Sequence, residues 1–203
     1  LLLVLTILII SRVGAALVTR NYYASGRYEV RAKVPRQLGA CTAFWSYHYI
    51  EYTPSQPEYW QEPNRIRNSE IDWEFPTAAD DGSANDTVTF DKARANTWGG
   101  KFGGEGGNES IRPNIGQLVG DGNFHTYTYE WHSGSPGVTP YIAWSIDGTE
   151  VARYTGATYG QDNVPFRASR FWLGIWFPAS GYKNLVGWAR NPDFDQTTLE
   201  LDW

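Results

Sequence analysis

The chain has 203 residues, a formal net charge of -5 and an aromatic content that includes 10 Trp and 13 Tyr. Its length suffices for one domain with a substantial core, and its acidic charge argues against binding nucleic acid or an anionic membrane by charge. The single cysteine, Cys41, excludes an internal disulfide.

The first ten residues are apolar except for Thr6. A signal-peptide core or a membrane anchor would have this composition, but the run is too short to span a bilayer and no basic residue precedes it. The chain contains no methionine, even at its first position. We therefore expect a buried strand here, with one or more preceding strands missing from the chain.

Alternation of apolar and polar residues predicts short strands along the remainder of the chain. In residues 27–34, for example, charged residues alternate with apolar ones from Tyr28 to Val34. Asp147-Gly148 is typical of a tight hairpin turn, and no stretch has a helical period. Strands are expected at residues 15–19, 27–34, 124–131, 141–146, 149–154, 171–177 and 197–203.

Polar loops rich in Gly and Pro separate these strands, the longest at residues 51–67, 78–85 and 99–123. Many short strands without helices predict an all-β sandwich of two antiparallel sheets. We expect a single domain over residues 1–203, with long loops that shape a groove along one face. The tryptophans assigned to its core are Trp131, Trp144 and Trp203.

Three carboxylates alternate with apolar residues in the segment 70–75. In a strand, successive side chains point to opposite faces. One face would then carry Glu70, Asp72 and Glu74, and the other Ile71, Trp73 and Phe75.

An acidic strand face is often simply exposed or part of a cation site, but here it is backed by apolar residues in a Trp-rich chain. Retaining glycosidases place two carboxyl groups about 5–5.5 Å apart, and inverting ones roughly 6.5–9.5 Å apart. Along a strand Glu70 and Glu74 have Cα atoms about 13 Å apart, so their side chains must lean together on a curved sheet. Asp72 between them would favour one ionised and one protonated neighbour.

The sequence resembles family 16 of the glycoside hydrolases, which are concanavalin-like β-jelly-roll endo-glucanases and their relatives. Residues 68–76, Asn-Ser-Glu-Ile-Asp-Trp-Glu-Phe-Pro, are similar to the active-site strand of that family. The similarity continues in order at residues 24–35, 123–131, 144–148 and 194–203. It implies that Glu70 is the nucleophile, Glu74 the general acid/base and Asp72 the assisting carboxylate of a retaining mechanism.

The resemblance also implies a sugar-binding groove, since aromatic rings suit the apolar faces of pyranoses. The matching positions are Arg20, Trp45, Tyr47, Asn96, Trp98, Trp172 and Trp176. His125 is interpreted as a packed, hydrogen-bonded histidine, because the three histidines form no metal-ligand pattern. Asp202 resembles a structural calcium ligand of some relatives, yet no metal or cofactor is assigned.

Specificity is the least determined property. Many relatives that cut β-1,3-glucan have an extra bulge residue before the last Glu. This chain lacks that residue, and so do relatives acting on mixed-linkage β-1,3-1,4-glucan or xyloglucan. The segment 47–67, with Glu58, Trp60 and Glu62, could wall one end of the groove. Sulfated galactans are disfavoured because no basic cluster is present.

The sequence thus predicts a retaining, endo-acting hydrolase of β-1,3- or β-1,3-1,4-glucans. A transglycosylase using the same site is the alternative, and a non-catalytic lectin-like domain is disfavoured because both Glu residues are present. We expect a monomer whose partner is a β-glucan polysaccharide, with no nucleic acid or membrane partner. An extracellular location is expected, to which the glycosylation tripeptides at Asn85 and Asn108 add weak support.

Overall fold

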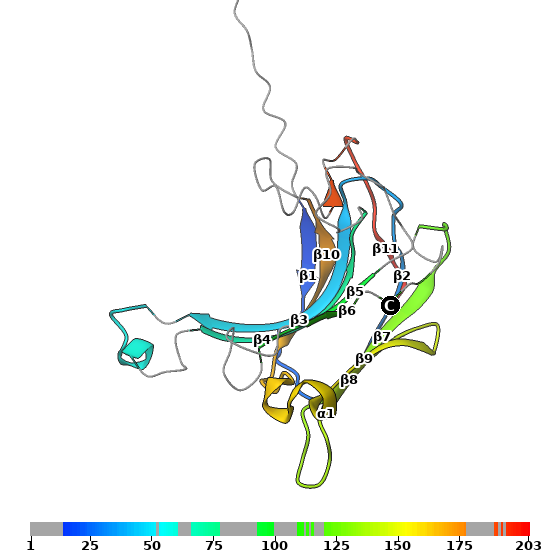
Figure 1. Cartoon of the computed structure of the whole chain (residues 1–203). Helices are drawn as coiled ribbons and strands as arrows, with labels where there is room; N and C mark the ends of the chain where they lie inside the picture. The colour runs from blue at the N-terminus through cyan, green and yellow to red at the C-terminus, as the bar shows by residue number, and fades with distance from the viewer. Residues whose placement is uncertain are drawn as a thin grey trace, which may run out of the picture.

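Two antiparallel sheets form a sandwich in the computed structural model (Figure 1). It describes residues 14–51, 53–60, 66–77, 93–99, 109–111, 113, 115, 120–177, 189–190, 192 and 194–203. The expected N-terminal strand and the two glycosylation asparagines, Asn85 and Asn108, lie outside these residues. The all-β jelly-roll sandwich predicted from the sequence is confirmed.

The six-stranded sheet has the order β1-β10-β3-β4-β5-β6 and is strongly curved, whereas the five-stranded sheet has the order β11-β2-β7-β8-β9. The strands of the first are β1 (Ala15–Val18), β10 (Arg170–Trp176), β3 (Cys41–Glu51), β4 (Ile66–Phe75), β5 (Arg94–Gly99) and β6 (Glu109–Ile111). Those of the second are β11 (Glu200–Leu201), β2 (Gly26–Lys33), β7 (His125–His132), β8 (Tyr141–Ile146) and β9 (Thr149–Thr155). Short helical turns are η1 (Pro57–Trp60), α1 (Gly156–Tyr159) and η3 (Gln161–Asn163).

The core lies between the sheets and is largely aromatic. Every second residue of β2 and β7 points into it, as the alternating sequence predicts. Its largest fully buried side chains include Trp73, Trp131, Trp144, Tyr127, Tyr129, Tyr154, Phe44 and Phe75. The core positions of Trp131 and Trp144 are therefore confirmed.

The assignment of Trp203 to the core is wrong, since this side chain is 60% exposed. Strand β11 spans only Glu200–Leu201, and beyond it the chain is joined to β2 by its backbone, through Arg31 N donating to Trp203 O over 2.8 Å. A backbone hydrogen bond fixes the path of the chain without burying the side chain.

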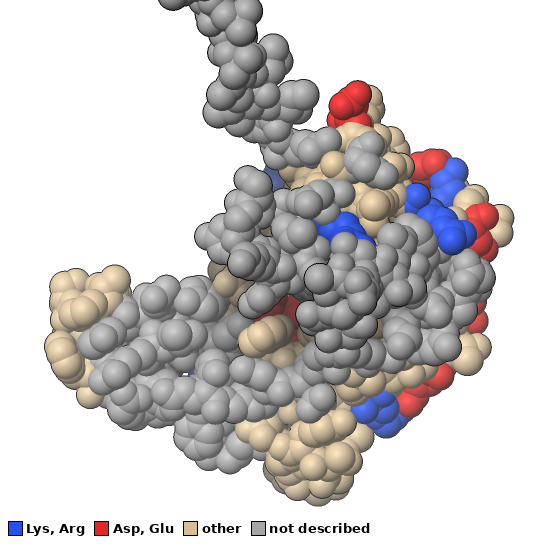
Figure 2. Space-filling view, turned by 45° about the horizontal axis from the view of Figure 1, so that its top comes forward, with Lys and Arg blue, Asp and Glu red and all other residues tan. Residues whose placement is uncertain are grey.

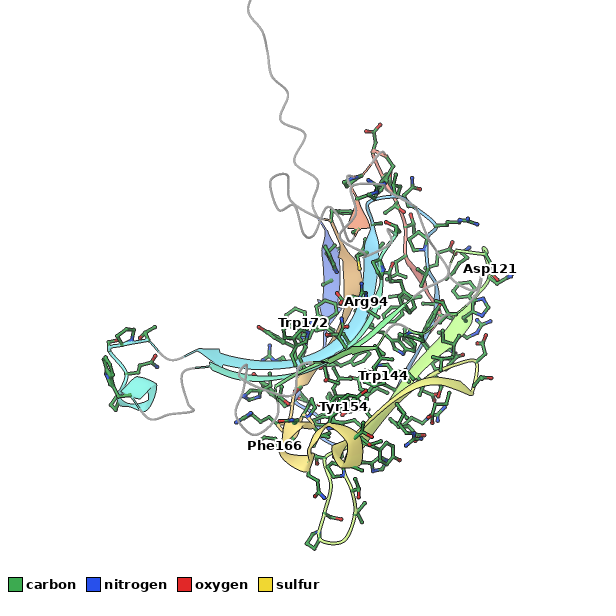
Figure 3. All side chains as sticks on the ribbon, in the orientation of Figure 1. Arg94, Asp121, Trp144, Tyr154, Phe166 and Trp172 are labelled. Atoms are coloured by element: carbon green, nitrogen blue, oxygen red, sulfur yellow. The ribbon has the colours of Figure 1, made fainter. Side chains whose placement is uncertain are left out.

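Two indole N–H groups join the sheets through buried hydrogen bonds. Trp73 of β4 donates to the Thr128 carbonyl of β7 over 3.0 Å. Trp144 of β8 donates to the Asp72 carbonyl of β4 over 2.9 Å, and Figure 3 shows it among the side chains that fill the sandwich. Both bonds hold β4 at a defined depth above the five-stranded sheet, because a buried polar group without a partner is costly.

The β8–β9 hairpin turns at Asp147 and Gly148, as predicted. Their φ angles of 48° and 80° lie in the left-handed region that tight hairpin turns require. Asp147 also anchors β7, because its carboxylate accepts from Thr126 N and lies 2.6 Å from Nδ1 of His125. The buried His125 is thus hydrogen-bonded, as the sequence indicated.

The short helical turns were not expected, nor was β6, which lies within the loop expected at residues 99–123. The helix α1 is a single turn whose N-cap, Thr155, accepts from Thr158 N over 3.2 Å. One turn is too short to give a helical period in the sequence. No helix among the described residues is long and apolar enough to cross a bilayer.

Strands β3 and β4 extend past their neighbours as a two-stranded ribbon. The pairing of β3 with β10 ends at Tyr47, whereas its pairing with β4 continues to Glu51. The ribbon projects from the body in Figure 1 and carries η1, where Trp60 is 67% exposed. This is the segment that could wall the groove, although Glu62 lies outside the described residues.

Charged side chains on the outer face of the five-stranded sheet form ion pairs. They include Arg27 with Glu130, Arg31 with Asp202 and Lys33 with Glu200. Figure 2 shows acidic and basic side chains interspersed along this side of the molecule. Asp202, the residue that resembles a calcium ligand, is therefore paired with an arginine, and no three His, Cys, Asp or Glu side chains of the described residues gather as around a metal ion.

A pair of tryptophans tests where the core ends. Trp131→Ala is expected to lower the free energy of unfolding by about 3–5 kcal/mol, because it removes a fully buried ring and the indole donor to Pro165 O. Trp203→Ala is expected to change it by less than about 0.5 kcal/mol. Urea unfolding followed by circular dichroism measures both, and equal losses would contradict this account of the core.

Candidate active site

The three carboxylates lie on one face of β4, opposite the core. Strand β4 sits between β3 and β5, and both pairings are antiparallel without a register shift, so the absence of a bulge is confirmed. Its inward residues Ile71, Trp73 and Phe75 are buried in the core. In a strand this places Glu70, Asp72 and Glu74 on the concave face of the curved sheet.

The register shows which side chains surround each carboxylate. Directly opposite residues of antiparallel strands share a face, with Cβ atoms about 4.5–5.5 Å apart. Glu70 is opposite Tyr47 and Trp98, Asp72 is opposite Trp45 and Asn96, and Glu74 is opposite Ala43 and Arg94. Figure 2 shows acidic atoms at the bottom of a hollow near the middle of the view.

An aromatic platform continues this surface onto β10. Trp172 is paired with Trp45, and their rings stack with centroids 5.7 Å apart and planes at 15°. Within the described part of the chain the buried indole nitrogen of Trp172 has no hydrogen-bond partner. The platform therefore combines a flat apolar face with an unused donor, which suits a sugar.

Asp72 is the most deeply buried of the three acids, at 4% exposure. Burial, together with the charges of Glu70 and Glu74, raises its pKa well above the usual range. Asp72 is also hydrogen-bonded to Glu70. A protonated Asp72 donates in that bond, which leaves Glu70 as the ionised acceptor.

Glu74 is held by groups from two other strands. Asn96 Nδ2 donates to Oε2 of Glu74 over 2.6 Å, and the Trp176 side chain of β10 is also hydrogen-bonded to it. Burial and the charge of Glu70 raise the pKa of Glu74 to about 8, although Trp176, Arg94 and Asn96 each lower it. Glu74 is therefore protonated at neutral pH.

The face thus combines an ionised Glu70, hydrogen-bonded to Asp72, with a protonated Glu74. This is the division of charge that a nucleophile and a general acid require.

The structure brings together six of the seven predicted sugar-binding residues. The residues on the concave face are Trp45, Tyr47, Asn96, Trp98, Trp172 and Trp176. Arg20 is different, since it is exposed just beyond β1 and belongs to no strand register.

Three residues of this face were missed in the sequence. Arg94 lies two positions before Asn96, Arg170 two before Trp172, and Cys41 is paired with Trp176. Period-2 counting from the neighbouring predicted residues would have found both arginines.

Comparison with known proteins finds related sequences. A family model described as "Glycosyl hydrolases family 16" matches residues 3–203. A beta-glucanase of Acetivibrio thermocellus is 28% identical over 169 residues, which are 83% of this chain and 39% of the relative. The chain spans less than half the length of each of the curated relatives compared.

Solved structures share the fold. The Bacillus licheniformis beta-glucanase aligns with a TM-score of 0.58 at 20% identity, covering 91% of this chain and 65% of that one. The apo Crh5 transglycosylase also aligns with a TM-score of 0.58, at 22% identity, covering 88% and 60%. At these identities the similarity shows the jelly-roll fold alone.

The raised pKa of Glu74 predicts how stability depends on pH. Between its ordinary value of 4.5 and its folded value of about 8, the folded protein holds a proton that the unfolded chain has released. The free energy of unfolding therefore falls as pH rises through this window. Glu74→Gln, which cannot ionise, should lose less stability than the unchanged protein between about pH 5 and about pH 8.

Urea unfolding across this series measures the difference. Glu150→Gln is the matched control, because Glu150 is an exposed glutamate of the other sheet, paired with Arg153. Identical pH dependence in Glu74→Gln and the unchanged protein would contradict the protonated state of Glu74.

Proposed function

The chain belongs to family 16 of the glycosyl hydrolases, and on this premise we propose that it is a retaining, endo-acting hydrolase of β-glucans. The observation that carries the proposal is the row on β4, where Asp72 is hydrogen-bonded to Glu70 while Glu74 has a pKa of about 8. A non-catalytic binding domain would have no need to gather three carboxylates on one strand face, with Asp72 buried between the other two, at this cost.

The chemistry follows in two steps. Glu70 attacks the anomeric carbon, the glycosidic bond breaks, and the departing oxygen takes the proton of Glu74, leaving a glycosyl ester on Glu70. Glu74, now a carboxylate, takes a proton from water as that water attacks the same carbon. The ester bond breaks, Glu70 becomes a carboxylate again, and the configuration of the sugar is retained.

The other side chains of the concave face serve binding in this proposal. The stacked Trp45 and Trp172, together with the exposed Trp98, offer flat faces to successive sugar rings. Strand β4 has no bulge before Glu74, which favours mixed-linkage β-1,3-1,4-glucan over β-1,3-glucan. Such polymers lie outside cells, so an extracellular location fits this substrate.

A transglycosylase is the second candidate, and this hypothesis is supported by the fold that the chain shares with the Crh5 transglycosylase. It would use the same first step and differ only in the acceptor. A sugar hydroxyl would then replace water in the attack on the glycosyl ester.

Product analysis on a panel of glucans tests the proposal. We expect short oligosaccharides from lichenan, because an endo-acting site binds the middle of a chain. We expect less product from laminarin and none from agarose. Adding an oligosaccharide acceptor distinguishes hydrolysis from transfer, because only transfer lengthens that acceptor. Absence of cleavage on the whole panel would contradict the proposed function.

The role of Glu70 has its own test. Glu70→Ala should abolish cleavage of lichenan, because no group remains to form the glycosyl ester, while binding of the polymer persists. Azide can enter the space of the lost carboxylate, so we expect α-glycosyl azide as the rescued product. Glu150→Ala on the other sheet should retain full activity, and undiminished turnover by Glu70→Ala would rule out this nucleophile.

A further inference from the structure

A buried arginine lies beside the acid of the catalytic row. Arg94 is 5% exposed and is directly opposite Glu74 in the β4–β5 pairing. Opposite residues of an antiparallel pair share a face at a Cβ separation of about 4.5–5.5 Å. The Arg94 side chain therefore leaves its strand on the side that carries the carboxylates, and Figure 3 labels it on this sheet.

A guanidinium so deeply buried is costly unless negative charge compensates it. On β4, Glu74 is directly opposite Arg94, and Asp72 and Glu70 follow along the same face. With Asp72 and Glu74 protonated, Glu70 carries the negative charge of this row at neutral pH. Within the described ranges, the side chains that hydrogen-bond to Glu74 and the nearby Cys41 thiol are uncharged at neutral pH. They are Asn96 on β5, Trp176 on β10, and the Cys41 thiol on β3, whose pKa is raised by burial and by Glu74.

We propose that Arg94 is a positioning residue that sets how readily Glu74 gives up its proton. The inference rests on the proposed function, because it concerns the proton that Glu74 delivers to the leaving oxygen. When that O–H bond breaks, Glu74 becomes a carboxylate in a site that already holds Glu70. The fixed positive charge of Arg94 stabilises this carboxylate until water returns a proton in the second step.

The electrostatics of the site agree with this role. Burial and Glu70 raise the pKa of Glu74, and Arg94 is one of three groups that oppose them. Without this opposition the carboxyl group would keep its proton to a higher pH and would be a weaker acid. Arg94 therefore balances two needs, a proton present at neutral pH and a proton that can leave.

The pH profile of kcat/KM on lichenan tests the proposal in three variants, Arg94→Met, Arg94→Gln and Arg94→Lys. The alkaline limb reports loss of the Glu74 proton in the free enzyme. In the Met and Gln variants we expect it to move up by about one pH unit, with a lower kcat. The Lys variant should keep the limb near its original position, because it keeps the charge.

Arg153→Met is the matched control, since it removes an arginine from β9 of the other sheet. A merely structural role for Arg94 would lower activity or stability without moving the limb. A limb that stays in place or moves down in folded Met or Gln variants would overturn the proposal. So would a Lys variant that shifts as the Met variant does.

A second readout needs no turnover. Carboxyl carbons of ¹³C-labelled glutamate can be titrated by NMR, with Glu74→Gln identifying the signal of Glu74. We expect this signal to titrate at higher pH in Arg94→Gln than in the unchanged protein, and an unchanged titration would overturn the inference. A chain that cleaves no glucan yet shows this shift would contradict the proposed function and leave the electrostatic role of Arg94 supported.

Discussion

Burial of the apolar face of β4 is the constraint on which the site depends. Three like charges on one strand repel each other, and an isolated strand would expose them to water. Here the opposite face carries Trp73 and Phe75, which belong to the core. A slip of one residue would turn the acids inward and the rings outward, so the apolar burial of β4 enforces the clustering of its acids. The indole bond from Trp144 to the Asp72 carbonyl fixes the same register from the other sheet.

The neighbouring strands decide what the clustered acids become. Asp72 is surrounded by its own row and remains protonated, whereas Glu74 receives a hydrogen bond from Asn96, one from Trp176 and the charge of Arg94. The pKa values of Asp72 and Glu74 are thus both raised, but only that of Glu74 is opposed by hydrogen bonds and a positive charge from other strands. That difference, more than the presence of the acids, suits the row to acid/base chemistry.

Local patterns predicted much of the fold. The alternation in β2 and β7 and the turn at Asp147 were read correctly because each depends on a few adjacent residues. Trp203 was wrongly placed in the core, since its burial depends on what covers the end of β11. The single turn of α1 was missed because one turn has no period. The set of partners on the concave face was incomplete because the sequence does not show which residues of β4 and β5 are paired, although counting by two from Asn96 would have placed Arg94 on this face.

By itself, the sequence determined that β4 carries acids on one face and apolar rings on the other, because side chains of a strand alternate and this period is written in consecutive residues. It also determined a two-sheet sandwich, through the same alternation repeated in strand after strand. Only the tertiary structure decided how deeply Asp72 and Arg94 are buried and which donors reach Glu74. The physical reason is that desolvation and charge interactions depend on distances across strands, and these distances are set by how the two sheets pack and not by any one segment.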